Sequence, residues 1–311
     1  MKIIPLTNQM KPLVTVVCLT YNQEAYIAET IKGFVSQQTN FHFEIIIHDD
    51  ASTDSTLSVV MQYQARYPGF ITVISQEKNI YSKGVRVPAL VFSHAKGRFI
   101  AYCEGDDFWV DPHKLQKQAD LLLGNPKIGV VFTNKNVYYQ ERGKLIEGFS
   151  MRSLSPVPIG DVRKVLLVSN PFSACTAMFR TEAVSGYEVI ATKLRSKMDD
   201  YVMWLFIANK YDFGYLTEVT ATYRVLKHSA SHSPSLDIVK CFHKSTYKVA
   251  SYFNREYMRL VSQKEIKESY RKRVFGYMLA NGYYKASLSY ASSIPEYVVI
   301  LLSTKLRRIL R

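Results

Sequence analysis

The sequence has few cysteines and no long apolar run. Its four cysteines, at positions 18, 103, 175 and 241, are far apart and form no C-x-x-C pair. They predict neither a disulfide framework nor a zinc site, and they favour a reducing compartment. No apolar run, Tyr297–Leu302 included, approaches the roughly 20 residues that a membrane-spanning helix needs. Residues 1–12 lack the apolar core of a secretory signal. We therefore expect a cytoplasmic protein.

Acidic residues are scarce in the last quarter of the chain. The formal net charge is +14, and residues 240–311 contain 15 Lys or Arg against four Glu and no Asp, a net +11. Such asymmetry favours an anionic partner, either a membrane surface or nucleic acid. A solvated basic face is the alternative interpretation.

The first half of the chain alternates apolar, β-branched runs with helical patterns. Strands are predicted at 13–20, 44–48, 71–74, 98–103 and 129–133. Helices are predicted near 27–35, 55–66, 84–95 and 112–123, the last opened by Pro112, and Leu57, Val60 and Met61 are expected to face inward. This alternation predicts an α/β fold, a Rossmann-like, mostly parallel sheet with helices on both faces.

The second half has a less regular pattern. A hairpin turn is expected at Arg142-Gly143, a helix over 198–210, and two short strands at 213–216 and 219–225. Beyond Ser233-Pro234 the pattern is helical. We expect one large α/β domain over residues 1–235 and a basic helical extension over 236–311.

Polar residues follow three of the predicted strands where each strand ends. The segments are Thr20-Tyr-Asn-Gln-Glu24, His48-Asp-Asp-Ala-Ser-Thr-Asp54 and Glu104-Gly-Asp-Asp107. Ligands of open α/β sheets bind at the carboxyl ends of the strands, so these carboxylates should converge. Mg²⁺ or Mn²⁺ would compensate their charge and accept a diphosphate. Taken alone, the second segment is equally explained as a helix-capping turn, and the third as a solvated loop.

Three motifs, in order and spacing, resemble glycosyltransferase family 2, whose members have the GT-A fold. They are Val16-Val-Cys-Leu-Thr-Tyr-Asn22, Ile46-Ile-His-Asp-Asp-Ala-Ser-Thr-Asp54 and Ala95-Lys-Gly-Arg-Phe-Ile-Ala-Tyr-Cys-Glu-Gly-Asp-Asp-Phe-Trp109. The similarity covers roughly residues 12–233. It implies an inverting, metal-dependent hexosyltransferase that uses a nucleotide sugar, with UDP as the expected nucleotide. The implied acceptor is a glycan or lipid-linked hydroxyl in polysaccharide, lipopolysaccharide or capsule biosynthesis.

The resemblance also implies roles for individual residues of these motifs. The donor-binding set is Thr20, Tyr21, Asn22, Glu24, Asp50, Glu104 and Asp106, with Asp50 accepting a hydrogen bond from the base. Glu104-Gly-Asp106 stands where the family usually has Asp-x-Asp. Asp106, with Asp107 close by, is the implied site for Mn²⁺ or Mg²⁺.

Met198-Asp-Asp-Tyr-Val-Met-Trp204 resembles the acidic pair of the same family. It implies that Asp200 is the general base and Asp199 its neighbour. An inverting transfer needs one carboxylate to accept the proton of the attacking hydroxyl. The alternative is that the pair only favours a helix N-terminus electrostatically.

Basic residues near the family's closing segment are the remaining candidates. Arg224, Lys227 or His228 is the expected diphosphate contact there, and Arg86 is another; a solvated loop is the alternative for the closing segment. Trp109 and Trp204 are expected to be packing residues.

The sequence pattern of residues 295–311 predicts an amphipathic basic helix. We expect either peripheral contact with the inner face of the cytoplasmic membrane or packing against protein.

Two other functions are less consistent with the sequence. A sugar-phosphate nucleotidyltransferase would open with a Gly-rich basic loop after the first strand, where this chain has Tyr21-Asn-Gln-Glu24. A module that binds anionic surfaces or nucleic acid would carry basic residues at the strand ends, which here are acidic. We therefore expect no nucleic-acid partner.

Overall fold

The computed structural model describes residues 11–153, 156–227 and 235–280, together with 283, 287 and 290. The chain divides into two compact units, residues 1–166 with 170–226, and residues 167–169 with 227–311. The first unit thus ends before the boundary expected near residue 235, which stays a prediction.

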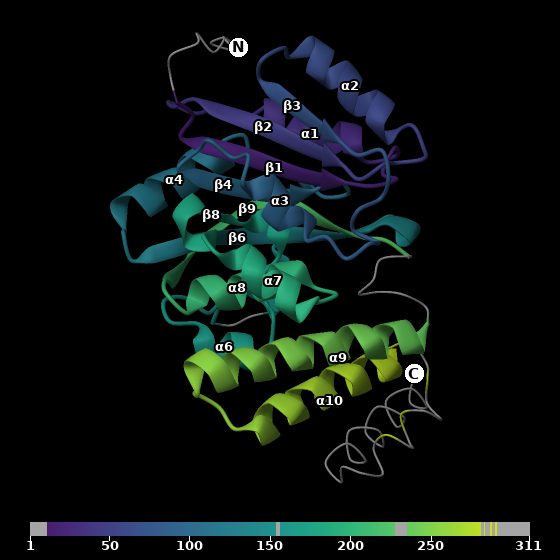
Figure 1. The fold of residues 1–311 in the computed structure, drawn as a ribbon, viewed down its shortest axis with the longest axis vertical. Coiled ribbons are helices and arrows are strands. Elements are labelled where there is room, and N and C mark those ends of the chain that lie inside the picture. The colour runs from purple at the N-terminus through teal and green to yellow at the C-terminus, as the bar shows by residue number, and fades with distance from the viewer. Residues whose placement is uncertain are drawn as a thin grey trace. The chain divides into compact units, whose positions relative to one another are not determined.

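The first unit begins with a parallel, four-stranded half-sheet in the order β3-β2-β1-β4 (Figure 1). The strands are β1 (Val14–Thr20), β2 (Phe43–Asp49), β3 (Ile71–Ser75) and β4 (Phe99–Glu104). The helices between them are α1 (Ile27–Val35), α2 (Thr56–Arg66) and α3 (Val87–Phe92). These elements confirm the predicted strand–helix alternation, whose buried, β-branched strands suit a sheet covered on both faces.

The second half of the same sheet is mixed in direction. β8 (Met178–Arg180) lies antiparallel between β4 and β6 (Ile128–Tyr139), and β9 (Asp212–Val225) is parallel to β6. β5 (Phe108–Trp109) pairs with β9, and β7 (Lys144–Ile146) forms the predicted hairpin with β6. Gly143 has a left-handed φ of 56° in that turn, which glycine adopts without strain.

Three details of the prediction were wrong. β9 is one strand, because a register irregularity lets the exposed Thr217 and Glu218 bulge out where a break was expected. Helix α4 (Lys114–Gly124) begins two residues after Pro112. Met61 is 48% exposed, because α2 buries a narrower stripe that includes Val60.

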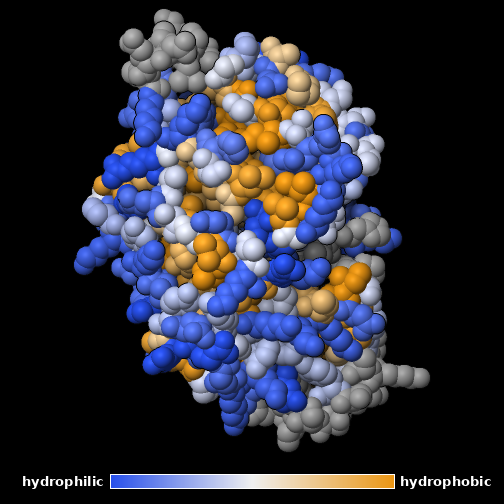
Figure 2. Space-filling view, viewed as in Figure 1, coloured by the Kyte–Doolittle hydropathy of each residue, from blue (hydrophilic) through white to orange (hydrophobic). Residues whose placement is uncertain are grey.

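Helices cover both faces of the sheet, as predicted. One face packs against α1, α2 and α4 through a single buried cluster that includes Val16, Ile31 and Leu115. The opposite face packs against α3 and α8 (Asp199–Ala208) through aromatic contacts, among them Phe92 with Tyr102 and Phe132 with Trp204. Trp109 and Trp204 are both buried, which confirms their expected packing role. Figure 2 shows one face of the molecule, where separate hydrophobic patches lie among hydrophilic side chains.

The remaining elements are short in the first unit and long in the second. They are η1 (Gln140–Arg142), α5 (Phe149–Ser153), α6 (Arg163–Val168), η2 (Ala174–Thr176), η3 (Thr181–Val184), α7 (Tyr187–Leu194), α9 (Leu236–Phe253), a π-helical turn (Asn254–Met258) and α10 (Gln263–Ala280). In the second unit α9 and α10 lie side by side (Figure 1). None of the described helices is both long and apolar enough to cross a membrane. The amphipathic stretch 295–311 lies outside the described residues.

Candidate functional site

The loops that follow β1 and β2 are joined by side-chain hydrogen bonds. The main-chain N–H of Asn22 donates to Ser52 Oγ at 2.9 Å, and the main-chain N–H of Thr53 donates to the side-chain Oδ1 of Asn22 at 2.7 Å. The Ser55 amide donates to Glu24 Oε2 at 2.7 Å. Asn22 has a left-handed φ of 52°, which asparagine tolerates better than most residues. Asn22 and Glu24 thus hold the two loops together, and their contact with a nucleotide stays a prediction.

The other residues predicted from the first motif differ in exposure. Thr20 is buried, and its hydroxyl donates to Gln23 Oε1 at 2.8 Å. Tyr21 is 46% exposed at the same edge. The Tyr21 side chain is therefore open to a ligand, whereas that of Thr20 is not.

Asp50 fixes a segment that lies beyond β3. Its two carboxylate oxygens accept hydrogen bonds from the Ile80 amide at 2.8 Å and the Tyr81 amide at 3.1 Å. The next residue, Ala51, has a left-handed φ of 62°, a strained conformation of the kind that clusters at functional sites. A carboxylate retains lone pairs after two such bonds, so the expected contact with a base stays a prediction.

The turn after β4 brings Glu104, Asp106 and Asp107 to the same sheet edge. Asp107 is only 2% exposed, and its Oδ1 accepts a hydrogen bond from the Arg224 amide at 2.8 Å. Glu104 is exposed and Asp106 is half-buried. A Cβ at Gly105 would lie 2.9 Å from Thr20 Oγ1 and 3.0 Å from Thr20 Cβ, so a larger residue would push this turn away from the end of β1. The turn therefore presents Glu104 and Asp106 outward and turns Asp107 inward.

Arg224, at the end of β9, supports this turn from behind. Its Nε donates to the Asp106 carbonyl oxygen at 2.8 Å, and its two terminal nitrogens donate to Gln140 Oε1 and Glu29 Oε2, each at 2.5 Å. Its side chain is 5% exposed. Three aromatic rings surround the guanidinium, those of Tyr26, Phe108 and Tyr138. Arg224 is therefore a support for the turn and not the expected diphosphate contact. Lys227 stays a prediction, and His228 lies outside the described residues.

The acidic pair at the start of α8 is held differently. Asp199 forms a buried ion pair with Arg86, with Nη1 3.0 Å from Oδ1, so Arg86 serves this pair in place of the suggested phosphate contact. Asp200 Oδ1 accepts a hydrogen bond from the Tyr201 amide at 2.7 Å. Burial raises the pKa of Asp200 to about 6, and the charge of Asp199 adds to the rise. Such a carboxylate is ionised at neutral pH and is more basic than an ordinary aspartate.

Electrostatics link the two acidic groups. The pKa of Glu104 lies well above its ordinary value. The first cause is the surrounding protein, which partly removes the carboxyl from water although the residue is exposed. The second is the negative charge of four nearby carboxylates, those of Asp106, Asp107, Asp200 and Asp199. Carboxylates from the β4 turn and from the start of α8 therefore converge on one region, although some 90 residues separate them along the chain.

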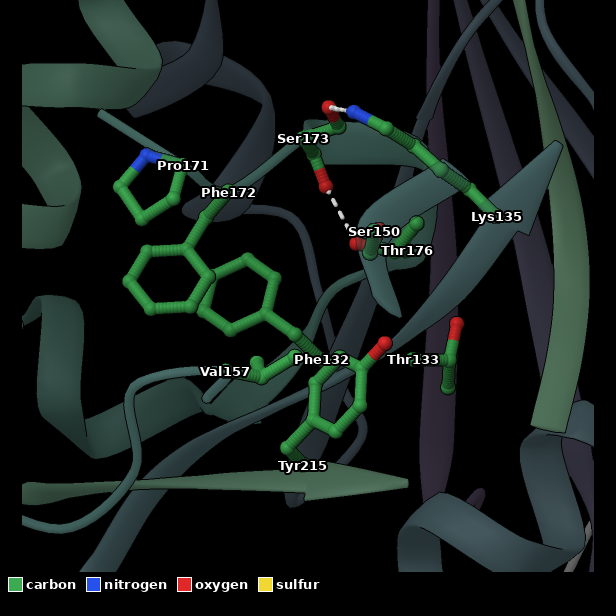
Figure 3. A pocket seen from close by; sticks show the side chains of 10 residues that line it. All are labelled: Phe132, Thr133, Lys135, Ser150, Val157, Pro171, Phe172, Ser173, Thr176 and Tyr215. Carbon is green, nitrogen blue, oxygen red and sulfur yellow. Dashed lines mark hydrogen bonds between the residues drawn. The ribbon is translucent and has the colours of Figure 1, made fainter. Parts of the chain in front are cut away.

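Lys135 is a charged residue near the site that the sequence reasoning missed. Its ammonium donates to Ser173 Oγ, and burial lowers its pKa, while nearby acidic groups that include Asp107 and Asp200 oppose the shift. The sequence feature that could have identified it is a charged lysine among the buried residues of a strand. Lys135 also lines a narrow cavity of the size that one water molecule needs (Figure 3). Its other lining residues are Phe132, Thr133, Ser150, Val157, Pro171, Phe172, Ser173, Thr176 and Tyr215. No predicted site residue is among them, so this cavity is not the expected donor site.

A divalent cation fits the outward carboxylates of the β4 turn. Glu104 and Asp106 offer the oxygen ligands that Mg²⁺ and Mn²⁺ prefer, in a region where neighbouring carboxylates help to raise the pKa of Glu104. Over the described ranges, no group of three or more His, Cys, Asp or Glu side chains is arranged to hold a metal unaided. The ion would therefore need a diphosphate and water to complete its coordination.

Curated relatives match different parts of the chain. An uncharacterized protein of Mycobacterium tuberculosis is 44% identical over 131 residues, 42% of this chain and only 37% of that protein's length. The putative glycosyltransferase EpsE of Bacillus subtilis is 31% identical over 70% of this chain and 74% of its own. WfaP of Escherichia coli, a UDP-Glc:α-D-GlcNAc-diphosphoundecaprenol β-1,3-glucosyltransferase, is 29% identical over 73% and 83%.

Solved structures cover most of the chain, and a family model covers just over half of it. TarS of S. aureus with UDP-GlcNAc has a TM-score of 0.61 at 16% identity, covering 92% of this chain and 80% of TarS. The mannosyltransferase PcManGT of Pyrobaculum calidifontis with GDP-Man and Mn²⁺ has a TM-score of 0.62 at 18% identity, covering 97% and 82%. These similarities confirm the predicted GT-A fold. The family model for glycosyl transferase family 2 matches residues 15–185, which is more than half of the sequence, and the chain therefore belongs to that family.

Proposed function

We propose that this chain transfers a sugar from a nucleotide-diphosphate sugar, with UDP as the expected nucleotide, to an acceptor hydroxyl with inversion at the anomeric carbon. The observation that carries the proposal is that the Glu104–Asp107 turn and the Asp199–Asp200 pair lie near one another. Segment 80–86 is hydrogen-bonded to Asp50 at one end and to Asp199 at the other, and the charges of Asp199 and Asp200 act on Glu104. One group suits the diphosphate end of a donor and the other suits the reacting hydroxyl. TarS and PcManGT, which share the fold, bind nucleotide sugars.

In this proposal Asp200 is the general base. The acceptor hydroxyl gives its proton to the Asp200 carboxylate while its oxygen forms a bond to the anomeric carbon. The bond from that carbon to the phosphate oxygen breaks on the opposite face, and the diphosphate leaves with its electron pair. Only one displacement occurs, so the anomer is inverted, and no carboxylate nucleophile is needed.

Asp106, together with Glu104, would hold the divalent ion. Bound there, Mg²⁺ or Mn²⁺ stabilises charge on a departing diphosphate. The inward Asp107, bonded to the Arg224 amide, is better suited to shaping the turn than to direct coordination.

The acceptor is proposed to be a glycan or a lipid-linked sugar of a surface polysaccharide. WfaP, by its name, acts on a diphosphoundecaprenol-linked sugar. The net charge of +11 over residues 240–311 would favour an anionic membrane that carries such an acceptor. Sedimentation of the full chain with anionic vesicles, but not zwitterionic ones, and only at low salt, would support membrane contact. Equal sedimentation with both would contradict it.

The function itself is tested by the donor. A thermal-shift screen of UDP, GDP, dTDP and CMP sugars, each with Mn²⁺ or with chelator, should show stabilisation by one nucleotide class. That donor should then release its nucleotide on incubation with candidate acceptors. If no nucleotide sugar changes the melting temperature and none is turned over, the proposal fails.

A further inference from the structure

Arg86 connects two parts of the site that are far apart in sequence. It lies 113 positions before Asp199 and is 9% exposed. Its Nη1 donates to the Ser196 carbonyl oxygen at 3.0 Å and to Asp199 Oδ1 at 3.0 Å. Its Nε and Nη2 both donate to the Gly84 carbonyl oxygen at 3.1 Å. A planar guanidinium with five fixed donors can hold such a set, whereas an ammonium cannot.

The same side chain is fastened to the donor end of the site. Residues 80 and 81, a few positions before Arg86, donate their amides to the carboxylate of Asp50. The Arg86 guanidinium also lies 5.8 Å from the centre of the Tyr81 ring. The segment 80–86 therefore spans from Asp50, at the end of β2, to the first turn of α8.

The start of α8 has further supports. The Tyr187 hydroxyl donates to the Asp199 carbonyl oxygen at 2.9 Å, and the Met198 amide donates to Ser196 Oγ at 3.0 Å. Arg86 adds a contact on each side of Met198, since it binds both Ser196 and Asp199. Losing it would remove two of the hydrogen bonds that restrain the backbone from which the Asp200 side chain projects.

We propose that Arg86 is a positioning residue, which acts through Asp199 to hold the first turn of α8 and so places Asp200 relative to the donor segment 80–86. The inference rests on the proposed function for the role of Asp200. Arg86 itself is not expected to touch the diphosphate, because its donors are engaged with protein acceptors.

Arg86→Lys is the test variant, and Arg180→Lys is its matched control. Arg180 is likewise buried, at 3% exposure, and donates to the carbonyl oxygens of Leu122, Asn125 and Ile128. It pairs with Phe99, at the opposite end of β4 from Glu104. Both substitutions remove a buried guanidinium, but only the first should affect the catalytic step.

Kinetics and hydrogen exchange are measured on the full chain. Arg86→Lys should lower kcat by about 10- to 100-fold, since small misplacements of a reacting group have effects of this size, and should change the KM for the donor by less than about threefold. Without any ligand, amide exchange over residues 196–201 should accelerate in Arg86→Lys and stay unchanged in Arg180→Lys.

The two readouts separate the possible failures. A higher donor KM with unchanged kcat would make Arg86 a donor contact and overturn the inference. Unchanged exchange over 196–201 in Arg86→Lys would overturn it whatever the activity. If the wild-type chain turns over no nucleotide sugar, the proposed function fails, and the exchange measurement still decides whether Arg86 holds this turn.

Discussion

The two acidic pairs of the first unit differ in the protein group that binds one member of each. After β4, Asp107 is turned inward onto a main-chain amide, and Asp106 remains open. At the start of α8, Asp199 is paired with a guanidinium, and Asp200 has no ion pair within the described part of the chain. An amide oxygen can replace a carboxylate as an acceptor, but it cannot replace a countercharge. The two pairs should therefore respond differently to the same Asp→Asn change.

The largest effect is expected from Asp200→Asn. Transfer should fall by roughly 10²- to 10⁴-fold, the usual contribution of a positioned base, while nucleotide binding stays nearly intact. Nucleotide-release kinetics and calorimetric titration measure the two quantities, and the anomeric coupling in the NMR spectrum of the wild-type product reports inversion. Wild-type turnover in the variant would remove Asp200 from the mechanism, and a retained anomer would remove the single displacement.

The next effect is on stability. It separates Asp199 and Asp107, the members of the two pairs that already have a protein partner. Asp199→Asn leaves the buried Arg86 without its counterion, so the free energy of unfolding should fall by about 3 kcal/mol. Asp107→Asn keeps an acceptor for the Arg224 amide, so its cost should be below about 1 kcal/mol. Urea denaturation of both variants gives the comparison. Equal losses would show that the two pairs are not held in different ways.

Donor affinity should separate the members of the β4 pair. Asp106→Asn should weaken UDP binding in Mn²⁺ by at least about tenfold, because it removes a ligand of a diphosphate-bound cation. Asp107→Asn should change it by less than about threefold. Calorimetric titration with and without chelator is the measurement. An affinity for UDP that chelator leaves unchanged would exclude a metal from donor binding.

The pH dependence of kcat should reflect the raised pKa of Asp200. A base acts when ionised, so kcat should rise about tenfold per pH unit up to a pKa of about 6 and then level off, above the 3.8 of an ordinary aspartate. The charge of Asp199 raises this pKa, so Asp199→Asn should move the rising limb of the kcat–pH profile to lower pH. A limb unmoved in Asp199→Asn would show that the two carboxylates do not interact as described.

Much of the fold was predictable from local sequence because its signals are local. Short apolar runs, rich in β-branched residues in β1 to β3, marked β1 to β4, and the acidic segments directly after β2 and β4 marked the sheet edge. The partners of the acidic residues were not predictable in the same way. Arg86 and Asp199 are 113 positions apart, and Arg224 and Asp106 are 118 apart, so only the folded sheet brings them together. The break expected within β9 failed because pairing with β6 continues past a bulge, which a one-dimensional pattern does not contain.

The hydrogen bonds between the β1 and β2 loops have a thermodynamic consequence. Ordering a mobile side chain on association costs roughly 0.5–1.5 kcal/mol, mostly as entropy. Asn22, Glu24 and Ser52 are already restrained in the free protein, since each is bonded across the two loops. A nucleotide that contacts this edge should therefore bind with a small entropic penalty, and its heat of binding should closely follow the contacts it makes.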